Sequence, residues 1–394
     1  MADAEPLITT AAGLSELVDR LRAARRFAFD TEFVSEETFE PVLCLIQVAT
    51  RDLLAAVDPL AVADLAPFWD VVFDPGVEVV MHAAGEDLRI ARQRTGNVPA
   101  RVVDVQIAAG LVGLGFPLSL VNLVRQGLGI ALAGSETRTD WRRRPLSPAQ
   151  LDYALDDVRH LLELADALQG QLDALGRSSW AEAEYADFLA AIRDRNDEDR
   201  WRRLPGLHQL SRRGLEAARR LAGWRADEAR RANRPVRQVL RDDLLVAIAK
   251  RLPANRKDLE ALRDFNRSHL TPHAHRILAA VEAARAVPAD DLPEHPPRHD
   301  DGPGLTMVVG LLGAALAQCA AQGQVASGLV GSVGDLKDLV RWHLDGRPED
   351  RRPALVRGWR DEACGRVLLD VLAGRRSLRV ADPAADVPVA LDPV

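Results

Sequence analysis

The sequence predicts an α/β domain followed by two small all-α domains. In the N-terminal half, short apolar runs that are typical of strands (residues 27–34 and 77–81) alternate with segments whose apolar residues recur at helical spacing. Residues 201–285 show only the helical pattern. A proline-rich, acidic stretch at 287–304 then precedes a last helical segment, which begins at 305. The 394 residues of the chain are enough for two or three domains.

The first predicted strand carries two acidic residues on one face. Residues 27–34 read Phe-Ala-Phe-Asp-Thr-Glu-Phe-Val, and the two-residue period of a strand places Asp30 and Glu32 on the same side of the sheet. Two neighbouring carboxylates repel each other unless a cation lies between them. The pair therefore suggests a metal site, although Glu32 taken alone is better explained as a surface residue.

The second predicted strand, residues 77–81, leads into a short helix that spans residues 86–94. Asp87 then lies in the first turn of this helix, where the helix dipole favours a carboxylate. That position alone needs no functional explanation. His82, at the end of the strand, is expected to be a hydrogen-bonded structural residue, with contact to the reacting group as the alternative. Asp104 is expected to cap a later helix.

A third acidic site follows a clear helix start. Ser147 is a predicted N-cap, Pro148 occupies the first helical position and Gln150 completes a capping box. Tyr153 and Asp157 are four residues apart, so they lie on one face of this helix. A phenol one turn from a metal-binding carboxylate can hold a water molecule beside the metal. Three neighbouring acidic residues are expected to face solvent: Glu86, Asp152 and Asp156.

The order and spacing of these motifs resemble the ribonuclease D family of DEDD exonucleases, in the subclass with a tyrosine in the last motif. The Asp-x-Glu, Asp and Tyr-x-x-x-Asp motifs start at Asp30, Asp87 and Tyr153. The resemblance covers roughly the first half of the chain. Its further matches are Leu45-Ile46-Gln47, His82-Ala83, Asp104-Val105-Gln106, Arg138-Thr139-Asp140-Trp141 and Arg144-Pro145-Leu146.

This resemblance implies a ribonuclease H-like domain with a mixed sheet. It also implies that Asp30, Glu32, Asp87 and Asp157 hold two divalent metal ions, and that Tyr153 positions or activates the attacking water. Magnesium suits a site made of carboxylates, and manganese is the expected substitute. Two such ions, about 3.5–4 Å apart, can assist the attack, the charged oxygens and the leaving group. The implied reaction removes 5′-mononucleotides, one at a time, from a 3′ end.

Four residues are candidates for contact with the substrate. They are Thr31, Phe33, His82 and Arg138. Phe33 could pack against the terminal base, but an aromatic residue at a strand end more often belongs to the core. Asp140 and Trp141 either anchor a loop or touch the substrate, and the sequence favours neither interpretation.

One position departs from the family pattern. Relatives usually carry a lysine six residues before the aspartate of the Asp-Trp pair, and here that residue is Gly134. If the lysine contacts the phosphate backbone, Arg138 or the arginines at 142–144 could replace it. The carboxylate motifs are complete, so the departure concerns substrate binding rather than catalysis.

The net charge of −7 is distributed unevenly along the chain. Residues 201–285 contain 20 Arg and Lys against 9 Asp and Glu, a net +11, which leaves −18 for the rest. The short motifs Gly223-Trp224-Arg225 and Asn233-Arg234-Pro235 in this segment resemble the HRDC domain, a helical module shared with RecQ helicases. The resemblance implies auxiliary nucleic-acid binding. A solvated helical surface and a protein-contact module are the alternatives.

The C-terminal segment contains weaker matches to a second HRDC-like domain, at 339–343 and 358–360. The expected domains are therefore an exonuclease domain at 1–193, an HRDC domain at 194–286, a linker at 287–304 and a second HRDC-like helical domain at 305–394. The apolar stretch 305–320 is short for a membrane span and is expected to be a buried helix.

The predicted function is that of a 3′→5′ exoribonuclease that acts on tRNA precursors or other structured RNA 3′ ends. The acidic N-terminus lacks the features of a signal peptide, and Cys44, Cys319 and Cys364 form no zinc or redox motif. We therefore expect a cytoplasmic monomer without a membrane partner.

Two alternatives to this function remain. A DNA exonuclease resembling Werner-helicase or proofreading domains would share the carboxylates, and no residue in the sequence reports on recognition of a 2′-hydroxyl. A catalytically inert RNA-binding protein is the other alternative, against which the complete set of motifs argues.

Overall fold

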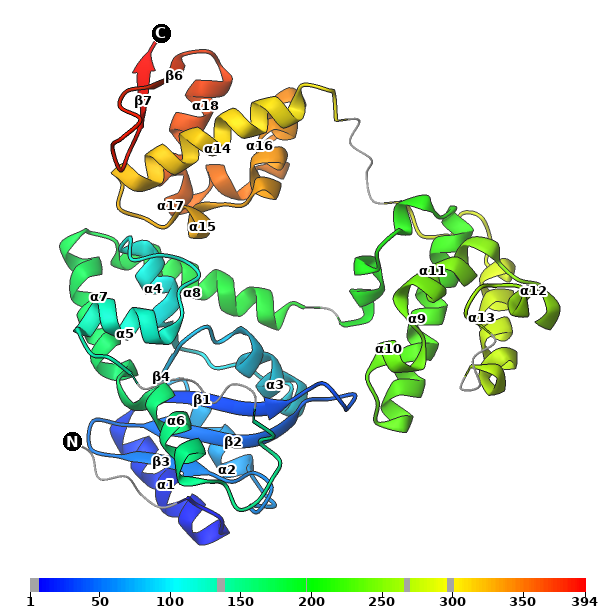
Figure 1. The fold of residues 1–394 in the computed structure, drawn as a ribbon, viewed down its shortest axis with the longest axis horizontal. Helices are drawn as coiled ribbons and strands as arrows, with labels where there is room; N and C mark the ends of the chain where they lie inside the picture. Colours follow the sequence, from blue (N-terminus) through cyan, green and yellow to red (C-terminus); the bar gives the residue numbers. More distant parts are fainter. Residues whose placement is uncertain (1–6, 133–138, 196, 266–269, 296–300) are drawn as a thin grey trace. The chain divides into compact units, whose positions relative to one another are not determined.

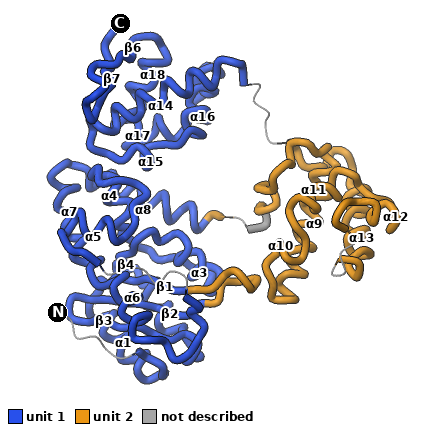
Figure 2. The backbone as a smooth tube through the Cα atoms, viewed as in Figure 1, with its two compact units in different colours: residues 1–32, 43–193, 300–394 blue, residues 33–42, 194–299 orange. Residues whose placement is uncertain are grey.

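The computed structural model divides into two compact units (Figure 2). It describes residues 7–132, 139–195, 197–265, 270–295 and 301–394. The first unit contains residues 1–32, 43–193 and 300–394, and the second contains residues 33–42 and 194–299. The C-terminal region, residues 301–394, thus shares a unit with the N-terminal region although the basic segment separates them in sequence.

The N-terminal region is built on a five-stranded sheet with the strand order β3-β2-β1-β4-β5 (Figure 1). β2 and β3 pair in antiparallel fashion, whereas β4 pairs in parallel with both β1 and β5. The predicted mixed sheet is therefore confirmed. The strands are β1 (Arg26–Val34), β2 (Val42–Ala49), β3 (Leu54–Val57), β4 (Glu78–Met81) and β5 (Val102–Asp104).

Side chains from the strands and from the helices packed on them form the core of this region. Phe27 and Phe29 of β1 are fully buried, and the Phe29 ring meets the Trp69 ring edge-on, with centroids 6.1 Å apart. Helix α6 begins at Pro148 with the predicted capping box between Ser147 and Gln150. The helices are α1 (Ala11–Ala24), α2 (Ala66–Val72), α3 (Gly85–Thr95), α4 (Val105–Leu111), α5 (Leu120–Leu128), α6 (Pro148–Arg159), α7 (Leu161–Ala174) and α8 (Ser178–Arg193).

The parallel pairing of β1 and β4 decides where the site lies. Parallel strands end at the same edge of a sheet, and in α/β folds the edge at their carboxyl ends is where ligands bind. Asp30 and Glu32 lie in the second half of β1, and Asp87 follows β4 after a short turn. The first two predicted motifs therefore meet at one edge.

The C-terminal region is mainly helical but ends in a two-stranded antiparallel sheet. The all-helical expectation for residues 305–394 is wrong at this point: Arg376–Val380 and Val389–Pro393 pair residue by residue as β6 and β7. The helical spacing of apolar residues stops before β6, and a turn containing Pro383 joins the two strands. The helices are α14 (Leu305–Gln322), α15 (Ser327–Val330), α16 (Val333–Leu344), α17 (Gly358–Arg360), the π-helix η6 (Asp361–Gly365) and α18 (Arg366–Leu372), with 3-10 turns η4 (Glu349–Arg351) and η5 (Ala354–Val356).

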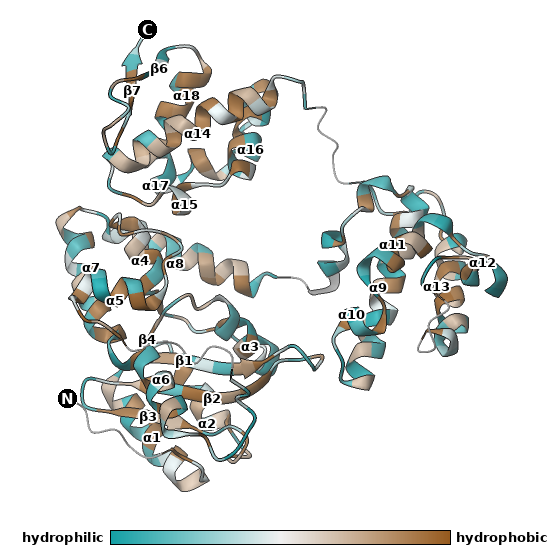
Figure 3. Ribbon diagram, viewed as in Figure 1, coloured by the Kyte–Doolittle hydropathy of each residue, from teal (hydrophilic) through white to brown (hydrophobic). Residues whose placement is uncertain are grey.

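Helix α14 forms the centre of this region. Within the described residues it is the one helix long and apolar enough to cross a membrane by length and composition (Figure 3). Val309, Leu312 and Leu316 are buried, and α14 packs against α16 and α18. It therefore serves as a core helix of the C-terminal region.

The second unit is a helical domain centred on α9. Its core includes Leu221, Leu245 and Phe265, all fully buried. The loop after β1 joins this unit through Phe39, whose amide donates to Asn233 at 3.3 Å and whose ring lies 5.0 Å from the Arg230 guanidinium. The elements are η1 (Asp197–Arg203), η2 (Leu207–Gln209), α9 (Arg212–Ala232), α10 (Val236–Val239), α11 (Asp242–Arg251), α12 (Arg256–Glu260), η3 (Thr271–His273) and α13 (Ala274–Ala286).

Candidate active site

Four carboxylates from three elements converge at the edge of the sheet. Burial raises the pKa of Asp30 well above its usual value, and the charges of Asp87, Asp157 and Glu32 raise it further. Each predicted motif therefore contributes a carboxylate that lies within electrostatic range of the others. Helix α6 brings Asp157 to the pair on β1, and the turn after β4 brings Asp87.

The other three carboxylates are also hard to ionise. Burial, followed by the charges of Asp157 and Asp87, raises the pKa of Glu32 to about 8. Burial raises the pKa of Asp157 to about 7, and the pKa of Asp87 is raised to about 6 for the same main reason. Partly desolvated like charges cannot all be ionised near pH 7 without a compensating cation.

The carboxylates fit a divalent metal site that is shared with other ligands. Within the described residues, no group of three or more Asp, Glu, His or Cys side chains is placed to hold a metal ion without further ligands. A hard divalent ion such as magnesium binds oxygen ligands and usually keeps several waters or substrate oxygens. An open set of four carboxylates suits such an ion, because water and a phosphate can complete its coordination.

Tyr153 lies beside the carboxylates and remains protonated. Its pKa is raised by burial and by the charges of Asp157, Glu32 and Asp30, and its hydroxyl is hydrogen-bonded to Asp157. The buried Trp141 ring stacks on the Tyr153 ring, with centroids 6.3 Å apart and planes 30° apart. A phenol held in this way can donate a hydrogen bond but cannot serve as a base near pH 7.

Asp140 and Trp141 occupy the positions expected of loop anchors. Asp140 accepts hydrogen bonds from the side chain of Arg142 at 2.9 Å and from its amide at 3.2 Å. Nearby, the Arg144 guanidinium donates to Asp58 and to the carbonyl oxygen of Trp141, at 2.7 and 2.8 Å. These contacts hold the loop before α6 and with it Trp141, whose ring stacks on Tyr153.

Asp104 holds the turn that leads to Asp87. Its carboxylate accepts hydrogen bonds from the amides of Ala83, Ala84 and Gln106, at 3.1, 3.0 and 2.9 Å. Asp104 thus caps α4, as predicted, and also fixes the turn after β4. Ala83 has a φ of 53°, an uncommon value for a residue other than glycine, so this turn needs such support.

His82 and Thr31 are both engaged within the protein. His82 Nε2 is hydrogen-bonded to the carbonyl oxygen of Leu118 at 2.9 Å, and burial lowers the pKa of the imidazole. The buried Thr31 hydroxyl donates to the Asp87 carboxylate. Thr31 therefore orients the Asp87 carboxylate, and His82 connects the turn after β4 to Leu118.

The structure also places most of the remaining substrate-contact candidates and the acidic residues that were expected to face solvent. Phe33 is half-buried near the end of β1, and Arg138 and Gly134 lie outside the described residues. Glu86 and Asp156 form ion pairs with Arg89 and Arg159, at 2.6 and 2.7 Å, one helical turn away. Asp152 is exposed, as predicted.

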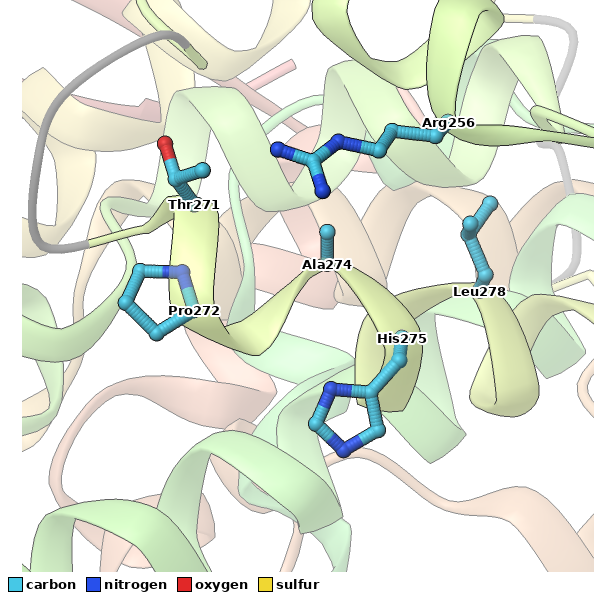
Figure 4. A pocket seen from close by; sticks show the side chains of 6 residues that line it. All are labelled: Arg256, Thr271, Pro272, Ala274, His275 and Leu278. Atoms are coloured by element: carbon cyan, nitrogen blue, oxygen red, sulfur yellow. The ribbon is translucent and has the colours of Figure 1, made fainter.

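The second unit contains an open cavity of about 480 Å³ (Figure 4). The cavity combines the Arg256 guanidinium and the His275 imidazole with apolar side chains. Its lining residues are Arg256, Thr271, Pro272, Ala274, His275 and Leu278.

Carboxylates gathered at the edge of a mixed α/β sheet are a nuclease arrangement, and comparison with known proteins agrees. A family model described as 3'-5' exonuclease matches residues 6–173, and one described as HRDC domain matches residues 214–281. The protein is therefore a 3′→5′ exonuclease that carries an HRDC domain. Nucleases of the DEDD type use divalent metal ions, which agrees with the carboxylate cluster.

Relatives that match this chain over nearly its full length show to which family of exonucleases it belongs. Ribonuclease D of Gluconacetobacter diazotrophicus is 37% identical over 95% of this chain and 94% of its own length. Ribonuclease D of Cronobacter turicensis is 32% identical, over 93% of this chain and 99% of its own length. The crystal structure of Escherichia coli RNase D, described as an exoribonuclease involved in structured RNA processing, matches with a TM-score of 0.81 at 31% identity, covering 94% and 98% of the two chains. The chain belongs to the ribonuclease D family and is a 3′→5′ exoribonuclease.

Proposed function

We propose that this exoribonuclease trims the 3′ ends of structured RNAs, tRNA precursors among them, as a cytoplasmic monomer with two Mg²⁺ ions. Asp30, Glu32, Asp87 and Asp157 are the proposed ligands. The observation that carries the proposal is the gathering of these carboxylates at one edge of the sheet, where burial raises all four pKa values and the charges of Asp87 and Asp157 raise those of Asp30 and Glu32 further. Such a cluster is stable near neutral pH when cations offset its charge.

The roles of the individual side chains follow from their surroundings. When bound, two divalent ions would activate water and stabilise the charge on the phosphoryl and leaving oxygens. Thr31 orients Asp87 through its hydroxyl. The protonated Tyr153 phenol is placed to orient the attacking water by a hydrogen bond, and Trp141 keeps the ring in place.

The proposed substrate rests on two supports. The structurally similar RNase D of Escherichia coli is described as acting in structured RNA processing. The HRDC domain adds a basic segment, with 20 Arg and Lys against 9 Asp and Glu in residues 201–285. Basic surfaces attract nucleic acid without regard to sequence, so this domain would retain a folded RNA while its 3′ end enters the site.

A comparison of substrates tests the proposal. The purified protein with Mg²⁺ is given a tRNA precursor with a 3′ extension, an unstructured RNA of equal length and the matching DNA. We expect the extension to be shortened to the folded body of the tRNA, and the DNA to remain intact. Degradation of DNA at the same rate would support the repair-type alternative and contradict the proposed substrate.

A further inference from the structure

We infer that the C-terminal region is a working part of the exonuclease site, because it holds the segment that anchors the turn before Asp87. The inference rests on the proposed function and assigns a role to residues outside the carboxylate cluster. Glu184, Arg360 and His82 act as positioning residues. A chain of contacts leads from α17 through α8 and α4 to the site.

The first contact joins α8 to α17. The Glu184 carboxylate on α8 accepts hydrogen bonds from the Arg360 guanidinium at 2.7 and 2.8 Å and from the Trp359 indole at 2.9 Å. The Trp359 ring also stacks on Trp180 of α8, with centroids 5.5 Å apart. The side chains of Arg360 and Glu184 are only 18% and 12% exposed. Loss of one partner therefore leaves a largely buried charge unpaired.

The second contact joins α4 to the loop after α14. The Arg177 guanidinium donates to the carbonyl oxygens of Leu111 and Gln324, at 2.6 and 2.8 Å. The Ala326 amide donates to the carbonyl oxygen of Gly110 at 2.7 Å. One arginine and one backbone hydrogen bond thus tie the end of α4 to the C-terminal region.

Glycines allow a close approach of backbone at the same place. A Cβ added to Gly328 would lie 2.5 Å from the carbonyl oxygen of Phe116, and one added to Gly113 would lie 2.9 Å from that of Gln324. Gly113 also has a φ of +85°. The segment 113–118 is therefore in direct backbone contact with the C-terminal region.

This segment reaches the site through Leu118. Its carbonyl oxygen accepts hydrogen bonds from His82 at 2.9 Å and from Gln106 at 3.1 Å. His82 opens the turn that Asp104 holds, and Asp87 follows this turn in α3. Helix α8 also packs directly against α3 and β5, the elements that carry Asp87 and Asp104. The C-terminal region thus supports one carboxylate of the site by two routes.

A positioning role and a role in RNA binding differ in their kinetic effect. A region that only binds RNA changes KM for long substrates and leaves the turnover of short ones intact. A region that positions Asp87 changes kcat on every substrate, because small displacements of catalytic groups are costly. A short substrate therefore separates the two roles.

The test compares full-length Glu184→Ala and Glu184→Gln with the control Arg375→Ala. Arg375 belongs to the same region and pairs with Asp370 at 2.6 Å, and its side chain is 61% exposed. On a 5′-labelled RNA trinucleotide, we expect Glu184→Ala to lower kcat at least about tenfold with little change in KM. Glu184→Gln keeps an acceptor for Arg360 and Trp359, so its kcat should lie between those of Glu184→Ala and the wild type. The kcat of the control should equal that of the wild type.

Hydrogen exchange gives a second readout that does not depend on activity. The amides of Ala83 and Ala84 should exchange faster in Glu184→Ala than in the control. A kcat or an exchange rate equal to that of the control would overturn the inference. A wild-type protein that leaves RNA intact would instead contradict the proposed function, and the exchange comparison would still decide whether the C-terminal region holds this turn.

Discussion

Tyr153 combines a raised pKa with a fixed ring. Burial and the charges of Asp157 and Glu32 keep its phenol protonated, and Trp141 restricts its movement. Its contribution is therefore a hydrogen bond to a water or to the substrate rather than removal of a proton.

The substitution Tyr153→Phe removes only the hydroxyl. We expect kcat to fall by up to about 100-fold, because the attacking water loses its orientation. The affinity for Mn²⁺, measured by calorimetry, should change little because the four carboxylates remain. A kcat equal to that of wild type would exclude the proposed role of the phenol.

The raised pKa values of the carboxylates predict how the stability of the metal-free protein depends on pH. The pKa values of Glu32, Asp157 and Asp87 are raised to about 8, 7 and 6, whereas unfolded carboxylates titrate near pH 4. The folded state therefore binds more protons than the unfolded state between about pH 4 and 8, and stability falls as the pH rises through this range.

This dependence is measured by urea denaturation in the presence of a chelator at several pH values. Asp157→Asn should be more stable than wild type at pH 8 by on the order of 1–3 kcal/mol, and the two should converge near pH 4. Excess Mg²⁺ should raise the stability of the wild type at pH 8 and raise that of the variant less. A difference that does not vary with pH would contradict the assigned pKa shifts.

At the scale of elements, we propose the cavity beside α12 and α13 as a contact of the HRDC domain with RNA. Arg256 is 61% exposed although it pairs with Glu260 at 2.6 Å, so its guanidinium can also meet a phosphate. His275 lies on the opposite side of Ala274 in the same cavity (Figure 4).

The double substitution Arg256→Ala/His275→Ala should weaken binding of long RNA. We expect the slope of log affinity against log salt to decrease by about 1, because one phosphate contact is lost. Arg231→Ala is a matched control, since Arg231 is 56% exposed and pairs with Glu228 at 2.7 Å. Fluorescence anisotropy measures both, and equal affinities for the two variants would remove the cavity from the RNA-binding surface.

The elements that were predictable from the sequence are those with a strong local signal. The strand with Asp30 and Glu32 and the capping box of α6 depend on period and on turn residues, and both were predicted. The hairpin of β6 and β7 was missed because its strands are short and largely exposed. Only the tertiary structure shows that Asp104 holds the turn before Asp87, or that the Trp141 ring stacks on Tyr153.

At the scale of the molecule, charge is separated along the chain. The segment 201–285 carries +11 and the remainder −18, so we expect RNA to be attracted to the HRDC domain rather than to the acidic remainder. Deletion of 201–394 would weaken the binding of long RNA and flatten its salt dependence. It would also remove the contacts of α8 with α17, so activity on short substrates should fall as well.

The most direct test of the account is cleavage of a 5′-labelled RNA by the wild type and by Asp30→Asn, with Mg²⁺ present and RNA binding measured in parallel. We expect the wild type to produce a ladder that shortens by one nucleotide at a time. The variant should bind RNA but leave it intact. Full activity of Asp30→Asn, or a wild type that binds RNA without shortening it in either Mg²⁺ or Mn²⁺, would contradict the assignment of the carboxylate cluster as the catalytic metal site.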